Sequence, residues 1–412
     1  MQVWRLRKGA DRRFRAGHPW AYSNELAESP RGIAPGELVE LCDAGGAFLA
    51  RGHGNPGSLI AFRALTRDRT ELDPLGAEGL GRRLERARGL RRALGLEASS
   101  HRLVFAEGDG LPGLVVDAYV LADASRVLVV QAHTAGMDRA LPAIDAALAG
   151  MHPEAGLVVR NDAGARALDG VAVEPPRIVR SPAGVDLSAA RIRVAGLELE
   201  TDLAAGQKTG FFLDQSANLA LAAERLVGLG AGSAGAPVRV LDLCCYVGQW
   251  GAYLGRAIAA RGRKAHVTLV DSSARALEVA ARNVAEQGAE VETLRADVLR
   301  DLPSLPTAGF DLVIADPPAL IARRKDAPQG THAYLQLFTQ AVRLVRPGGG
   351  VVACSCSALL EEPAFDGALA KAARRNDRIV RWIARGGQGP DHPVLLEFPE
   401  GRYLKCWIGM VG

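Results

Sequence analysis

Hydrophobic and polar positions alternate in two different ways along the chain, and the change falls near residue 190. After residue 190, short apolar runs alternate with amphipathic stretches. The apolar runs predict strands at residues 238–243, 267–270, 291–294, 310–315 and 350–353, with closing strands at 378–383 and 403–408. Helical spacing marks residues 274–287 and 334–345, and small residues at 230–236 indicate a loop before the first strand. Strands alternating with helices build a parallel doubly wound sheet, so we expect an α/β domain over residues 191–412.

Before residue 191 the apolar runs are shorter and turns are frequent. Runs at residues 32–41, 48–51 and 59–63, cut by glycine turns, predict a small β-barrel over residues 1–68. Residues 69–190 predict a middle α+β domain, with a helix at 69–94, strands at 113–117, 126–131 and 157–160, and a second helix at 137–148. We therefore expect three domains, which the length of 412 residues also favours.

The helix predicted at residues 69–94 is amphipathic and basic. Its leucines are expected to face the core, at positions 80, 84, 90 and 94. Its arginines are expected to form an outer face, at positions 82, 83, 86, 88, 91 and 92. Such a face either contacts phosphate or is simply solvated, and the sequence leaves both interpretations open.

Positive charge is concentrated at the N-terminus. Residues 1–70 hold eleven Lys and Arg against seven Asp and Glu, a net charge of +4. The whole chain also carries +4, so residues 71–412 are neutral in sum. A basic N-terminal module fits a polyanion-binding domain, although a solvated basic surface has the same composition.

Composition excludes several classes of protein. A hydrophobic content of 48% with 23% charged residues is typical of a globular protein, and no apolar run is long enough to cross a bilayer. No apolar segment follows the basic start, so we expect no signal peptide and a cytoplasmic location. The six cysteines form no Cys-x-x-Cys pair, so neither a disulfide framework nor a metal site is expected.

The candidate chemistry lies where two predicted strands end. The strand at 310–315 runs into an Asp-Pro-Pro motif that begins at Asp316, and the strand at 350–353 runs on to Cys356. Neighbouring parallel strands would place these two side chains together at the edge where such sheets bind ligands. A thiol beside an acid suggests covalent catalysis with Cys356 as the nucleophile. Cys354, one step back inside the sheet, is the less favoured alternative.

Carboxylates at successive strand ends predict a cofactor site, and they are Asp242, Asp271 and Asp297. Asp271, followed by Ser272, stands where an acid binds a ribose diol, and Asp297 suits an adenine amine. The turn after the first strand contains Tyr246 and Gly248, and glycine lets the backbone approach a ligand closely. This set predicts S-adenosyl-L-methionine, and the missing Gly-x-Gly-x-x-Gly fingerprint disfavours a nicotinamide oxidoreductase.

Seven short motifs combine into a family resemblance, at residues 9–20, 107–113, 207–215, 316–318, 355–357, 391–393 and 399–405. With them the chain resembles, nearly end to end, the bacterial class I, PUA-domain-containing 23S rRNA (cytosine-5)-methyltransferases. It departs from that pattern at residues 247–250, Val-Gly-Gln-Trp where Thr-Gly-Gly-Phe is usual, and at Ala319, where lysine is common. The resemblance implies a PUA-like β-barrel, an α+β middle domain and a Rossmann-like class I methyltransferase domain.

The resemblance also implies substrates and residue roles. It gives S-adenosyl-L-methionine as cofactor and 23S rRNA, or an assembling large ribosomal subunit, as partner. It places the nucleophile in the Ser-Cys-Ser triplet, and Lys208 and Gln215 in the cofactor or target pocket. Carbon 5 of cytosine becomes nucleophilic once a thiolate adds to carbon 6, so the reaction needs a cysteine, an acid and a sulfonium methyl. Asp316, which would also border the cofactor, is expected to stabilise the charge formed on the ring.

Several alternatives remain open. The basic run Arg323, Arg324 and Lys325 either contacts the RNA backbone or forms a solvated loop. An RNA purine N-methyltransferase would use Asp-Pro-Pro without a cysteine, which Ala319 and Cys356 speak against. A non-catalytic, SAM-binding RNA chaperone would need the cofactor site alone. A homodimer is compatible with the sequence, which fixes neither the oligomeric state nor the modified nucleotide.

Overall fold

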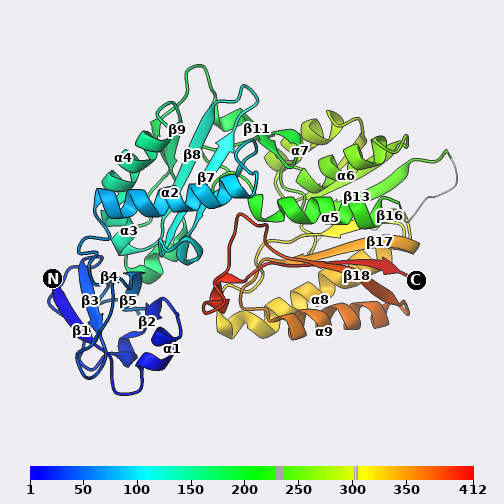
Figure 1. Ribbon diagram of the computed structural model, residues 1–412. Coiled ribbons are helices and arrows are strands. Elements are labelled where there is room, and N and C mark those ends of the chain that lie inside the picture. The colour runs from blue at the N-terminus through cyan, green and yellow to red at the C-terminus, as the bar shows by residue number, and fades with distance from the viewer. Residues whose placement is uncertain (229–234, 301, 303–304) are drawn as a thin grey trace. The chain divides into compact units, whose positions relative to one another are not determined.

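The computed structural model describes residues 1–228, 235–300, 302 and 305–412 (Figure 1). These form two compact units. The first unit comprises Met1–Arg193, Asp202–Leu213 and Pro390–Gly401, and the second comprises Val194–Thr201, Asp214–Gly389 and Arg402–Gly412. The predicted loop at 230–236 falls largely outside the described residues, and the three-domain division at residues 68 and 190 stays a prediction. No helix among the described residues is long and apolar enough to span a bilayer.

A five-stranded sheet opens the first unit, in the order β1-β3-β4-β5-β2. Its elements are β1 (Gln2–Arg5), α1 (Asp11–Arg15), β2 (Trp20–Ala21), β3 (Leu38–Cys42), β4 (Phe48–Gly54) and β5 (Phe62–Thr66). Trp4, Phe14 and Phe62 lie in its core. The strand predicted from residue 59 is β5, and it begins at Phe62, because Leu59 is exposed and lies outside the ladder. The predicted small β-sheet module is present.

A second five-stranded sheet follows, in the order β10-β9-β8-β7-β6. Its strands are β6 (His101–Phe105), β7 (Leu114–Val120), β8 (Arg126–Ala132), β9 (Gly156–Val159) and β10 (Arg177–Arg180). Its helices are α2 (Ala77–Ala93), α3 (Ala135–Arg139) and α4 (Leu141–Met151). The single helix predicted at 137–148 is therefore two, and α4 restarts with Pro142 in its first turn, where proline is well tolerated.

The expected faces of α2 need correction. Leu80 and Leu84 are buried as predicted, but Leu90 and Leu94 are exposed. Two arginines assigned to the outer face, Arg83 and Arg91, are buried instead. Each forms an ion pair with a carboxylate, which compensates the cost of burying the guanidinium. Both carboxylates lie outside the helix, so helical periodicity alone does not reveal the pairs.

The second unit is built on a seven-stranded sheet in the order β15-β14-β13-β16-β17-β19-β18. Its strands are β13 (Val238–Leu243), β14 (Ala265–Asp271), β15 (Glu290–Arg295), β16 (Phe310–Ala315), β17 (Val345–Ser355), β18 (Val380–Gly386) and β19 (Lys405–Val411). The first five are parallel, and β19 runs antiparallel to both neighbours. The remaining strands, β11 (Ala190–Val194) and β12 (Leu197–Thr201), form a two-stranded sheet.

Helices cover both faces of this seven-stranded sheet (Figure 1). On one side lie α5 (Ser216–Leu226), α6 (Gln249–Ala259) and α7 (Ala274–Ala285), and on the other α8 (Ala327–Leu344) and α9 (Glu362–Arg375). β13 has β14 on one side and β16 on the other, so strand order reverses beside it. Doubly wound sheets bind ligands outside the carboxyl ends of the strands at such a reversal. The predicted α/β fold is confirmed.

Candidate active site

Asp316 follows the last residue of β16, at the carboxyl edge of the sheet. The Gln215 side-chain amide donates to both carboxylate oxygens, at 3.0 Å each, and the Trp250 indole N–H donates to Oδ2 at 2.9 Å. Gln215 is held in turn by Asn218, whose amide donates to Gln215 Oε1 at 2.6 Å. These donors fix the orientation of the carboxylate. Gln215 was expected at the site from the sequence, whereas Trp250 and Asn218 were not.

Cys356 follows the end of β17, the strand next to β16. Its thiol is half-buried, and Sγ lies 4.0 Å from the carbonyl oxygen of Pro317, in the loop that Asp316 begins. Cys354, two residues earlier, is fully buried, and burial raises the pKa of its thiol well above the usual value. The two expected side chains thus come from neighbouring strand ends, and Cys356 is the more accessible of the two thiols.

Ser357 ties the loop after Asp316 to the strand that carries the cysteine. Its hydroxyl accepts the backbone N–H of Ile321 at 3.2 Å and lies 2.9 Å from the Tyr334 hydroxyl. Its carbonyl accepts a hydrogen bond from Lys405 Nζ at 2.9 Å. Ser357 therefore positions the segments on either side of the thiol. Tyr334 and Lys405 were not assigned roles from sequence, although Lys405 closes a motif that carries the family resemblance.

The turn after β13 has an unusual backbone that positions its residues. Cys244 and Tyr246 both have positive φ, 64° and 49°, and Gly248, with φ of 81°, caps α6. A Cβ on Gly248 would lie 3.0 Å from the Cβ of Ala280 in α7, so glycine is needed for packing as well as for conformation. The predicted ligand-approach role of Gly248 stays a prediction, because its close neighbours belong to α7.

Asp271 ends β14 and holds this turn in place. Its Oδ2 accepts the backbone N–H of Tyr246 at 2.9 Å and its Oδ1 accepts that of Ser273 at 2.9 Å. A carboxylate has further lone pairs beyond these two bonds, so Asp271 keeps acceptor capacity for a ribose hydroxyl. Ser272 is exposed beside it.

Asp242 and Asp297 occupy different environments. Asp242 is fully buried; Oδ2 accepts the N–H of Gly251 at 3.1 Å, and Oδ1 has no hydrogen-bond partner among the described residues. Burial raises the pKa of Asp242 well above its usual value. Asp297, two residues beyond β15, is half-buried and accepts the N–H of Leu299 at 2.9 Å. Their cofactor roles stay predictions.

The four carboxylates act together on Cys244, in the turn after β13. Burial raises the pKa of the Cys244 thiol well above its usual value, and the charges of Asp271, Asp316, Asp242 and Asp297 add to that effect. A cluster of acceptors at this edge fits the hydroxyl and amine groups of an adenosyl ligand. This set of hydrogen-bond acceptors therefore fits S-adenosyl-L-methionine.

Two further predicted elements have surroundings of their own. Lys208 belongs to the first unit, where its ammonium lies 4.3 Å from the centre of the Phe212 ring, so a cofactor role for it stays a prediction. Arg323, Arg324 and Lys325 are exposed at the start of a 3₁₀ turn, Arg324–Asp326, and both interpretations of this basic run remain open.

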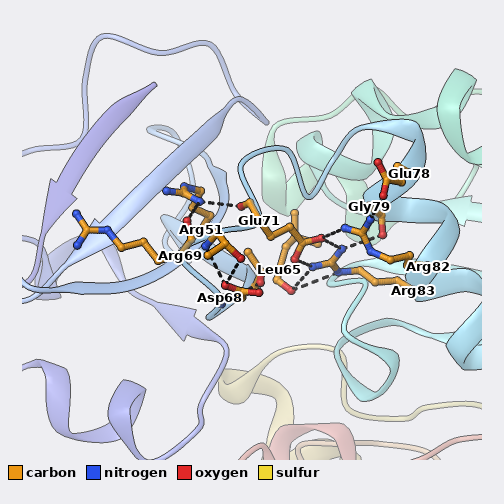
Figure 2. A network of polar contacts seen from close by, with 11 residues as sticks. Arg51, Leu65, Asp68, Arg69, Glu71, Glu78, Gly79, Arg82 and Arg83 are labelled. Atoms are coloured by element: carbon orange, nitrogen blue, oxygen red, sulfur yellow. Dashed lines mark hydrogen bonds and ion pairs between the residues drawn. The ribbon is translucent and has the colours of Figure 1, made fainter.

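In the first unit, Figure 2 shows how the N-terminal sheet is joined to α2. Glu71 accepts hydrogen bonds from Arg83 and Arg82 at 2.8 Å, and its carbonyl accepts one from Arg51 of β4 at 2.7 Å. Arg83 also donates to the carbonyl of Leu65 in β5 at 2.9 Å. The Arg83 guanidinium holds the pKa of Glu71 at about 2, so the carboxylate stays charged at neutral pH.

A groove of about 650 Å³ lies beside Glu71 and Arg83, between β5, the start of α2 and the turn at 107–112. Three exposed arginines line it, Arg67, Arg82 and Arg86. Arg82 is committed to Glu71 and Glu78, whereas no ion pair of Arg86 is found within the described ranges. The groove is therefore a candidate nucleic-acid surface.

Comparisons with known proteins agree with this description. Residues 5–67 match a PUA-like domain and residues 231–375 match the methyltransferase small domain. Ribosomal RNA large subunit methyltransferase I of Photobacterium profundum is 33% identical, with 98% of each chain covered. The protein of the same name from Klebsiella pneumoniae is 32% identical, covering 97% of this chain and 96% of its own.

Solved structures show the same fold. A Streptococcus mutans protein assigned as a SAM-dependent methyltransferase has a TM-score of 0.74 at 16% identity, with both chains covered completely. A crystal structure of a protein assigned as a methyltransferase, determined in complex with SAH, also has a TM-score of 0.74. It is 17% identical, and both chains are covered completely.

The doubly wound sheet and the acidic edge beside its strand-order reversal define a methyltransferase that uses S-adenosyl-L-methionine. More narrowly, relatives that align over nearly their whole length at 32–33% identity show that the chain belongs to the ribosomal RNA large subunit methyltransferase I family.

Proposed function

We propose that the protein transfers a methyl group from S-adenosyl-L-methionine to carbon 5 of a cytosine in 23S rRNA, through a covalent adduct on Cys356. The observation that carries the proposal is the half-buried Cys356 thiol beside the loop that Asp316 begins. A purine N-methyltransferase has no use for a thiol there. The name of the relatives, which specifies ribosomal RNA of the large subunit, supports the choice of substrate.

The chemistry needs a nucleophile and a stabiliser of ring charge. The Cys356 thiolate adds to carbon 6, which makes carbon 5 nucleophilic toward the methyl group that S-adenosyl-L-methionine supplies. Loss of the carbon 5 proton and expulsion of the cysteine then restore the aromatic ring. Asp316, held by Gln215 and Trp250, stabilises the protonated ring nitrogen or the exocyclic amine. The target base must leave its stack to reach a thiol at a strand end.

Nucleoside mass spectrometry tests the proposal. The protein is incubated with 23S rRNA and isotope-labelled S-adenosyl-L-methionine, and labelled 5-methylcytidine is the expected product. Cys356→Ala should abolish the label, while Cys354→Ala, at a buried thiol two residues away, should retain activity wherever it folds. A labelled purine, or full activity of Cys356→Ala, would overturn the proposal.

A trapped adduct gives an independent test of the covalent step. With an RNA that contains 5-fluorocytidine, methylation leaves a fluorine where a proton must depart, so elimination of the cysteine is blocked. A protein–RNA adduct that survives denaturation should form with the wild type and with Cys354→Ala, but not with Cys356→Ala. Peptide mass spectrometry should place the cross-link at Cys356.

The groove in the first unit is our proposed contact with the RNA backbone. Arg86 is exposed on its wall and is free to neutralise a phosphate. Arg86→Ala should weaken RNA binding and lower the slope of log Kd against log salt by about one. Arg92→Ala is the matched control, since Arg92 is exposed on the same helix and does not line the groove. Equal effects of the two substitutions would argue against the groove.

Location and assembly remain part of the proposal. An rRNA substrate, naked or in an assembling large subunit, implies a cytoplasmic protein. A homodimer stays a prediction, which light scattering of the purified protein checks directly.

A further inference from the structure

Lys405 is a buried cation at the first position of β19. It pairs with Ser355 across the ladder between β17 and β19, immediately before Cys356. Its ammonium donates to the carbonyl of Ser357 at 2.9 Å and to the carbonyl of Tyr403 at 2.8 Å. The two carbonyls orient the ammonium, but neither supplies a counter-charge.

No carboxylate forms an ion pair with Lys405 in the part of the chain that the structure describes, although a buried charge is costly without a counter-charge. Burial lowers the pKa of Lys405, while the charges of Cys356 and Glu362 raise it. The attraction is reciprocal: a positive charge that is stabilised by an ionised thiol also stabilises that thiolate.

Other ionisable groups also face this thiol. Tyr334 from α8 interacts electrostatically with Cys356, and Asp316 begins the loop that the thiol contacts. Glu362, in the first turn of α9, is exposed and acts on Lys405. Tyr334 is uncharged at neutral pH, whereas the carboxylate of Asp316 opposes ionisation of the thiol, so a nearby cation is needed to hold the thiol as a nucleophile.

We propose that Lys405 is the counter-charge that keeps Cys356 ionised, and thus a positioning residue for the covalent step. The inference rests on the proposed function for its catalytic meaning, but the ionisation itself is measurable without any turnover. The carbonyls of Ser357 and Tyr403 hold the ammonium in place whichever ionisation state the thiol adopts.

The test is the pH dependence of alkylation of Cys356 by iodoacetamide, followed by peptide mass spectrometry on the full-length protein. In the wild type the midpoint should lie clearly below the ordinary cysteine value of about 8.5. Lys405→Met should raise it by about one pH unit, which slows alkylation about tenfold at neutral pH. Lys405→Arg, which keeps the charge, should restore most of the shift.

The outcomes separate this inference from the proposed function. A wild-type midpoint at or above about 8.5, or equal midpoints in the wild type and a folded Lys405→Met, would overturn the role of Lys405. The wild-type measurement stands even where Lys405→Met does not fold, which circular dichroism and S-adenosylhomocysteine binding report. A low midpoint combined with a labelled purine product would leave Lys405 as the counter-charge and remove the cytosine-5 assignment instead.

Discussion

Trp250→Phe is the substitution that tests the orientation of Asp316 most directly. The indole N–H donates to Asp316 Oδ2 at 2.9 Å, and Trp250 is 2% exposed. Phenylalanine keeps an aromatic ring in the core at the start of α6 but removes the donor. It is also the residue that the resembled family usually carries at this position.

The size of the effect follows from the remaining hydrogen bonds. A hydrogen bond to a charged group contributes about 1.5–3 kcal/mol. Gln215 continues to donate to both oxygens of Asp316, so we expect the lower end, about 1.5 kcal/mol. If that free energy is lost from the transition state, kcat falls about tenfold.

The assay is transfer of labelled methyl groups to 23S rRNA at saturating substrate, with stability measured alongside by urea denaturation. Trp407→Phe is the matched control, because Trp407 is also 2% exposed and its indole also donates to a carboxylate, that of Asp366. Both variants should lose comparable stability, and Trp250→Phe alone should lose kcat. Equal kcat in the two folded variants would refute the reasoning.

Two further predictions concern pH and stability. Because the Arg83 guanidinium holds the pKa of Glu71 at about 2, the stabilisation is present above the ordinary value of 4.5 and is lost as pH falls toward 2. Glu71→Gln should therefore cost about 2 kcal/mol at pH 7, after allowance for solvent screening, and far less near pH 2.5 in urea titrations, whereas the exposed Glu78→Gln should cost under about 0.5 kcal/mol. Burial raises the pKa of Asp242, so its contribution to the free energy of unfolding is present at low pH. That contribution is lost as pH rises through the raised pKa. Asp242→Asn should gain Tm over the wild type between pH 5 and pH 8.5 in thermal melts, and a constant difference would contradict this.

Local pattern was sufficient for the central strands. The runs predicted at residues 238–243 and 310–315 coincide with β13 and β16, because each is a mostly apolar segment that is buried along nearly its whole length. Helix starts were less visible. The helix predicted from residue 334 begins at Ala327, because its first turns contain proline and polar residues and only its later turns carry the apolar stripe.

Long-range hydrogen bonds explain what sequence reasoning missed. Asp316 and Cys356 could be placed together because strand ends of a parallel sheet share an edge. The partners of Asp316 lie 101 and 66 residues away in the chain, at Gln215 and Trp250, and no local periodicity links them. Arg91 was expected on the outer face of its helix for the same reason, since its partner Asp109 comes from a turn after the next strand.

The motifs that carry the family resemblance can serve chemistry or structure. A motif whose polar side chains are buried and fully hydrogen-bonded serves structure. Asp391 and His392 belong to a matched motif, yet both are buried in the first unit. The carboxylate of Asp391 accepts the N–H of Arg102 at 2.8 Å and contacts His392 Nδ1 at 2.8 Å, while its carbonyl accepts from Arg91 at 2.6 Å. Every strong acceptor of Asp391 is thereby engaged, so this motif anchors residues 390–401 to the first unit. Cys356, the proposed nucleophile, differs in burial: it is only half-buried at a strand end, and reactive cysteines are partly exposed in this way.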